Sequence, residues 1–221
     1  MLARVTAALR RLPLALEMAL VIGLAFGRGI AEGLMLTFGG PARAAPVDHD
    51  SGILVLVARQ LATLALLLPF LHLRGWPLRG LRPRITARGS AIGLALCLLA
   101  FVSYLLLRTA FRAIAHAGPD PPSIPPSPLF ALLLIVINPI FEELLSACYV
   151  ITALARFGPV VAVGAGTLLR VSYHLYQGWA AATASMLTMG IVFGAYYWRS
   201  RDLWAVIVAH AAADVIGVAL L

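Results

Sequence analysis

The chain has 221 residues, of which 62% are hydrophobic and only 12% are charged, and its mean hydropathy is +0.95. A soluble domain carries about 25% charged residues, so this composition excludes an ordinary soluble globular protein. The high hydrophobicity also excludes a disordered chain. Two cysteines, Cys97 and Cys148, lie within apolar segments and are too few for a disulfide scaffold.

The apolar segments are long enough to cross a membrane. A hydrocarbon core about 30 Å thick requires about 20 predominantly apolar residues of helix. Seven such segments, bounded by arginine, proline or glycine, cover residues 12–38, 52–73, 89–111, 128–154, 159–177, 179–198 and 203–221. The sequence therefore predicts an all-α fold, a polytopic integral membrane helix bundle with about seven transmembrane helices.

The arginines predict the orientation, because positively charged loops stay in the cytoplasm. With the N-terminus inside, eleven of the 17 basic residues fall on the cytoplasmic side: Arg4, Arg10, Arg11, Arg74, Arg79, Arg82, Arg84, Arg88, Arg156, Arg199 and Arg201. Three fall on the other side, namely Arg43, Arg108 and Arg112. An odd number of crossings then gives an N-in/C-out orientation. Because the net charge of +8 is spread over these loops, no nucleic-acid partner is expected.

A proline-rich segment, GPDPPSIPPSP at residues 118–128, interrupts the series of apolar segments. Such a composition favours an extended linker. It predicts a boundary between an N-terminal three-helix membrane region, residues 1–127, and a C-terminal four-helix membrane region, residues 128–221.

Ionisable side chains concentrate in the four C-terminal segments. They are Glu142, Glu143, Arg170, His174, His210 and Asp214. The four that are charged by default cost on the order of 10 kcal/mol in a membrane, so they must pair, face water or do work. Residues four apart share a helix face, which groups His210 with Asp214. At a rise of about 1.5 Å per residue, Glu142, His174 and His210 lie near the middle third of the membrane. A carboxylate and two imidazoles are therefore expected to meet in one polar cavity.

Three segments carry a resemblance to a known family. NPIFEELLSACYV at 138–150, RVSYHLYQG at 170–178 and IVAHAAADV at 207–215 resemble the motifs of the CPBP family of intramembrane endopeptidases. This family comprises relatives of the type II CAAX prenyl proteases, including bacteriocin-processing and Abi proteins. The resemblance implies that residues 128–221 form a CPBP-type catalytic region.

Two positions depart from the family pattern. Ala147 stands where the first motif has arginine, and Arg170 stands where the second motif has phenylalanine. We expect Arg170 to supply the missing guanidinium by pairing with Glu143, so both residues are predicted to support the site.

The resemblance implies a glutamate-type intramembrane endopeptidase that hydrolyses a peptide bond of a membrane-associated or lipidated protein or peptide. Glu142, desolvated between helices, is expected to act as general base on a water. His174 is expected to hold that water or to move its proton. His210 is expected to stabilise the oxyanion, steered by Asp214, because an ionised carboxylate cannot donate a hydrogen bond.

Alternatives stay open at this stage. A zinc site is also possible, with Glu142, His174 and His210 as ligands and Asp214 as a carboxylate that hydrogen-bonds one of the ligands. The compact H-E-x-x-H spacing of zinc proteases is absent. The expectation is no cofactor, with zinc as the alternative. A catalytically inactive membrane scaffold or immunity factor is a second function, and a small-molecule or proton-coupled transporter is a third. The expected partners are the lipid bilayer, in a bacterial plasma membrane, and a peptide or protein substrate, whereas the oligomeric state stays open.

Other polar and small residues in the apolar segments have structural interpretations. Glu17 is expected to form an interhelical pair, and Arg28 and Glu32, four residues apart, can neutralise each other. Gly190 and Gly194 predict a close helix contact.

Overall fold

The protein is described by a computed structural model, which places residues 6–7, 9–39, 49–77, 83–115 and 125–219. The regular structure of these residues is entirely helical. The main helices are α2 (Leu14–Phe38), α3 (His49–Arg74), α4 (Ala87–Ala115), α5 (Pro128–Glu142), α7 (Pro159–His174), α8 (Trp179–Ser200) and α9 (Leu203–Ala219). Shorter elements are the π-helix η2 (Glu143–Tyr149), α6 (Val150–Ala153) and the 3-10 turns η3 (Ala155–Phe157) and η4 (Leu175–Gln177). The predicted all-α fold is confirmed.

Five helical segments are long and apolar enough to cross a membrane: Leu14–Phe38, Asp50–Arg74, Ala87–Phe111, Pro128–Ala153 and Trp179–Ser200. They correspond to five of the seven predicted spans. The other two, α7 and α9, have 16 and 17 residues. At about 1.5 Å per residue they are shorter than a hydrocarbon core of about 30 Å. The count of seven crossings therefore stays a prediction.

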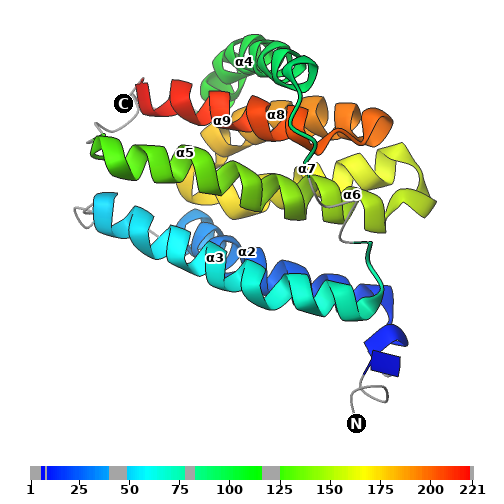
Figure 1. Cartoon of the computed structure of the whole chain (residues 1–221). Coiled ribbons are helices and arrows are strands. Elements are labelled where there is room, and N and C mark those ends of the chain that lie inside the picture. The colour runs from blue at the N-terminus through cyan, green and yellow to red at the C-terminus, as the bar shows by residue number, and fades with distance from the viewer. Residues whose placement is uncertain (1–5, 8, 40–48, 78–82, 116–124, 220–221) are drawn as a thin grey trace.

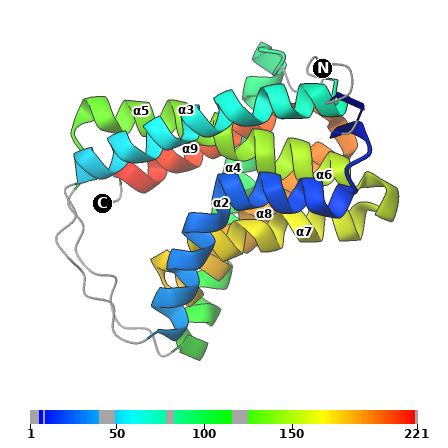
Figure 2. The same cartoon turned by 90° about the horizontal axis from the view of Figure 1, so that it is seen from below.

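The C-terminal helices form the centre of the bundle (Figure 1). On one side of them, α4 packs across α8 and α9. On the other side, α3 lies along α5 and α2 lies along α7 (Figure 2). Helices α2, α3 and α4 thus pack mainly on the C-terminal helices and little on one another. The predicted boundary near residue 127 stays a prediction.

Glycines allow α8 to approach α7 closely. A Cβ added at Gly190 would lie 2.7 Å from Thr167 Oγ1, and one at Gly194 would lie 3.0 Å from Val163 Cγ1. The close contact predicted for these two glycines is confirmed. A glycine also allows α2 to approach η4 closely, because a Cβ at Gly33 would lie 2.9 Å from Leu175 Cβ.

Two polar groups outside the predicted site have partners. Glu17 is buried and accepts hydrogen bonds from Trp76 Nε1 at 2.8 Å and Tyr149 Oη at 3.0 Å, besides its ion pair with Arg74. These contacts connect the start of α2 with the end of α3 and with η2. The predicted pair between Arg28 and Glu32 is present on the exposed face of α2, at 2.6 Å.

Candidate active site

The two adjacent glutamates point in different directions because of the helix that carries them. Pro139 interrupts the hydrogen bonding of α5, and η2 then replaces the α-helix from Glu143 onward. A π-helical turn is wider than an α-helical one and is frequent at functional sites. Adjacent residues on a helix point about 100° apart, and here Glu142 lines a cavity, whereas Glu143 is fully buried behind it.

Glu143 connects three of the helices. Its Oε2 is paired with the Arg170 guanidinium of α7, and its Oε1 lies 2.7 Å from His210 Nδ1 of α9. The expected pair between Glu143 and Arg170 is therefore present. Burying a charge costs several kcal/mol unless a partner compensates it, and Arg170 provides that compensation.

Glu142 is held from α7 and faces α9. Its Oε2 accepts a hydrogen bond of 2.6 Å from the Tyr173 hydroxyl and lies 4.0 Å from His210 Nε2. The Tyr173 ring stacks on Phe26 with a centroid distance of 4.4 Å, which fixes the hydroxyl from the α2 side. The Glu142 carboxylate is thus oriented toward the cavity.

The hydrogen bond that His174 makes assigns the roles of its two nitrogens. Its Nδ1 lies 2.9 Å from the carbonyl oxygen of Arg170, four residues earlier, so Nδ1 carries the hydrogen that is donated. Nε2 is then an acceptor on the cavity side when the ring is neutral. The ring lies between those of Tyr173 and Tyr176, at centroid distances of 4.5 and 6.0 Å.

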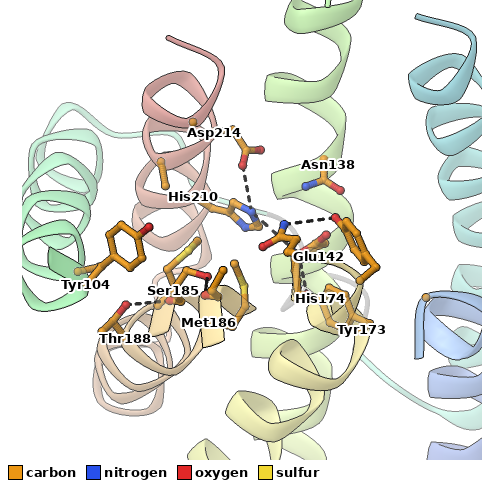
Figure 3. A pocket seen from close by; sticks show the side chains of 18 of the residues that line it. Tyr104, Asn138, Glu142, Tyr173, His174, Ser185, Met186, Thr188, His210 and Asp214 are labelled. Atoms are coloured by element: carbon orange, nitrogen blue, oxygen red, sulfur yellow. Dashed lines mark hydrogen bonds and ion pairs between the residues drawn. The ribbon is translucent and has the colours of Figure 1, made fainter. Parts of the chain in front are cut away.

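Asp214 lies one turn beyond His210 on α9 (Figure 3). Its Oδ1 is 3.6 Å from His210 Nε2, longer than a hydrogen bond. The nearer carboxylate is Glu143 at Nδ1, so the imidazole lies between Glu143 on one edge and Glu142 with Asp214 on the other. The steering of His210, expected from Asp214, comes first from Glu143.

The cavity has a volume of about 1250 Å³ and lies between the helices rather than on the surface of one. Glu142, His174, His210 and Asp214 line it, while Glu143 and Arg170 do not. Its walls come from the middle and C-terminal parts of α2 and α9, the N-terminal halves of α3 and α8 and the C-terminal end of α7, together with α4, α5 and η4. The structure therefore brings the four residues predicted as catalytic to one cavity, and their catalytic roles stay predictions.

Three polar residues that the sequence analysis did not place in the site also line this cavity. The Tyr173 hydroxyl donates a hydrogen bond to Glu142. Gln60 Nε2 of α3 donates a hydrogen bond of 2.6 Å to Asn138 Oδ1 of α5. Asn138 precedes Glu142 by four residues, so its spacing already placed it on the same helix face. For Gln60, the sequence offered only a weaker indication of a role in the site, namely a polar amide within an apolar segment.

The described residues contain no group of three His, Cys, Asp or Glu side chains arranged to hold a metal ion. The zinc alternative of Glu142, His174 and His210 stays a prediction. The side chains around these residues instead form hydrogen bonds and ion pairs with one another.

A family model matches the C-terminal part of the chain. Residues 124–216 match the family model described as type II CAAX prenyl endopeptidase Rce1-like. This match confirms the family resemblance for that segment, which contains all three motifs and every residue of the predicted site. The segment is CAAX protease-like and lies on helices typical of an integral membrane protein. No curated protein and no solved structure matches the chain significantly.

Proposed function

We propose that this protein is an intramembrane endopeptidase that uses Glu142 to activate a water against a peptide bond of a membrane-associated or lipidated substrate. The observation that carries the proposal is the Glu142 carboxylate, oriented by Tyr173 and facing His210 Nε2 at 4.0 Å inside a cavity of the bundle. A general base contributes about 10² to 10⁴-fold to such a reaction.

The proposed reaction uses the groups in sequence. His174 Nε2 accepts a hydrogen bond from the water, and Glu142 takes its proton as the oxygen attacks the carbonyl carbon. His210 carries hydrogens on both nitrogens, donating from Nδ1 to Glu143 and from Nε2 to the developing oxyanion. Collapse of the tetrahedral intermediate breaks the C–N bond, and Glu142 returns its proton to the leaving amine. Asp214, beside His210 Nε2, favours the doubly protonated ring.

We further propose the N-in/C-out orientation, which decides how a substrate reaches the site. The cavity walls belong to the ends of the helices where α2 finishes, α3 and α8 begin and α9 finishes. The opposite ends of these helices carry Arg74, Arg84, Arg88, Arg156, Arg199 and Arg201. Under the positive-inside rule the cavity opens toward the non-cytoplasmic face. The substrate is then a peptide segment presented from that face of a bacterial plasma membrane or from within the bilayer.

Comparative proteomics of membranes tests this function. Membranes that contain the wild-type chain are compared with membranes that contain Glu142→Gln, and the new peptide termini are identified by mass spectrometry. We expect at least one terminus to be lost in the variant while the protein accumulates normally. Glu32→Gln, a glutamate of the same cavity paired with Arg28, serves as the matched control and keeps the terminus. Identical termini in wild type and Glu142→Gln would instead indicate a non-catalytic scaffold.

A further inference from the structure

The cavity contains a pair of side-chain amides that the proposed mechanism does not use. Asn138 and Gln60 come from different helices, α5 and α3, and both line the cavity. Their exposed fractions are only 9% and 3%, so they are buried as well as cavity-lining. Gln60 Nε2 donates to Asn138 Oδ1 at 2.6 Å.

This hydrogen bond leaves Gln60 Oε1 and Asn138 Nδ2 for other partners. Gln60 Oε1 is buried and has no hydrogen-bond partner among the residues that the structure places. An unmade hydrogen bond of a buried acceptor costs about 1–3 kcal/mol, so this oxygen favours any ligand that brings an N–H. Asn138 Nδ2 carries two hydrogens, and the Asp214 carboxylate lines the same cavity.

The neighbouring charge also fixes the orientation of the amides. Asn138 Oδ1 accepts from Gln60 Nε2, so the NH₂ group of Asn138 is directed away from Gln60. Asp214 lines the same cavity, and a carboxylate attracts an NH₂ group rather than a carbonyl oxygen. A free N–H of Asn138 beside a free oxygen of Gln60 is the complement of a peptide group, which offers one C=O and one N–H.

We propose that the Gln60–Asn138 amide pair binds the backbone of the substrate, with Asn138 Nδ2 donating to the carbonyl oxygen under attack and Gln60 Oε1 accepting from a backbone N–H. This inference rests on the proposed peptidase function. It makes Asn138 a catalytic residue, because Asp214 can only accept and His210 otherwise stabilises the oxyanion alone. It also predicts that the backbone of an extended peptide, rather than its side chains, is what this wall of the cavity recognises.

An exchange of side chains tests the role of Asn138. Asn138→Asp keeps an acceptor for Gln60 but removes both N–H donors, and adding Asp214→Asn returns one carboxamide and one carboxylate to the cavity. The full-length variants are purified in lipid nanodiscs. Cleavage is measured on a synthetic peptide that spans the Glu142-dependent terminus from the membrane proteomics.

We expect Asn138→Asp to lower kcat roughly 100-fold with little change in KM, as removal of an oxyanion donor does. The double exchange is expected to recover at least 10-fold of this loss, which a purely structural role would not produce. Gln60→Leu is expected to raise KM, and Thr63→Val, a buried polar residue one turn away on α3, serves as its unchanged control.

The two proposals fail in different ways. A kcat for Asn138→Asp within about 3-fold of the wild type, or a double exchange no better than the single one when both variants fold, would overturn the amide-pair proposal alone. If Asn138→Asp does not fold, an unchanged KM in folded Gln60→Leu overturns the backbone contact. The absence of any Glu142-dependent terminus overturns the peptidase function and this inference together.

Discussion

At the scale of single residues, the site separates two glutamates that are adjacent in the chain. Glu143 is fully buried and neutralised by Arg170, whereas Glu142 faces the cavity and receives a hydrogen bond from Tyr173. A carboxylate that must take a proton has to be reachable from the substrate, and one that holds an imidazole has to be fixed. The partners of the two side chains fit these two tasks.

The hydrogen bond from Tyr173 to Glu142 gives a prediction at this scale. Tyr173→Phe keeps the ring on Phe26 but removes the hydroxyl at 2.6 Å. A hydrogen bond to a charged group contributes about 1.5–3 kcal/mol, so we expect kcat to fall roughly 10- to 100-fold with normal folding. The kcat is measured from peptide cleavage by the variant in lipid nanodiscs. Tyr197→Phe, which removes a buried hydroxyl bonded to Cys148, is the control, and equal rates for the two variants would contradict the prediction.

The proposed mechanism, in which Glu142 activates the water without a metal, predicts that activity does not depend on zinc. Wild-type protein dialysed against 1,10-phenanthroline is expected to keep its rate of peptide cleavage. Metal analysis of the purified protein is expected to find far less than one zinc per chain. Loss of activity on chelation with recovery on adding zinc would favour the alternative set of Glu142, His174 and His210.

At the scale of elements, the arginine that pairs with Glu143 comes from a different helix than the family pattern predicts. The family pattern expects arginine at position 147 in η2, and here Arg170 of α7 reaches Glu143 instead. Ala147 is buried in an apolar cluster, so its small side chain packs where an arginine is expected. The site therefore keeps its charge balance although two motif positions differ.

The compensation by Arg170 is testable through stability. Arg170→Phe leaves Glu143 buried without its cation, and breaking a buried pair in this way costs about 3–5 kcal/mol. We expect the thermal midpoint of the detergent-solubilised protein to fall, and we expect Ala147→Arg added to Arg170→Phe to restore part of it. Arg199→Ala, an exposed arginine of α8, is the control without effect. A double variant as unstable as Arg170→Phe would contradict the exchange.

At the scale of the whole molecule, the cavity lies toward the end of the bundle opposite Arg74, Arg84, Arg88, Arg156, Arg199 and Arg201. The N-terminal helices contribute to this arrangement by packing on two sides of the C-terminal ones, with α2 and α3 on one side and α4 on the other (Figure 1). The cavity is therefore enclosed by both parts of the chain, and residues 128–221 alone would lack the walls from α2, α3 and α4.

The orientation of the cavity can be measured in intact cells. Gln177→Cys puts a thiol on the exposed turn at the cavity, and Arg156→Cys puts one at the opposite end. A membrane-impermeant maleimide is expected to label position 177 in intact cells and position 156 only after permeabilisation. The native Cys97 and Cys148 are buried, so the wild type provides the background. The reverse labelling pattern would contradict the N-in/C-out orientation.

The sequence by itself determined the helical membrane class, the family segment and the set of ionisable residues, because length, hydropathy and the cost of burying charge act on each segment separately. It also predicted the pair of Arg170 and Glu143, because an unpaired buried charge requires a partner. It did not predict that Glu143 would hold His210, or that Gln60 would reach Asn138.

Only the tertiary structure decided those contacts. Which glutamate faces the cavity depends on how α7 and α9 pack around it, and the contact of Gln60 depends on where α3 packs against α5. The length of α7 depended likewise on the turn at η4, which ends the helix at His174. Local spacing assigns residues to a helix face, but the rotation and depth of one helix against another follow from packing among all of them.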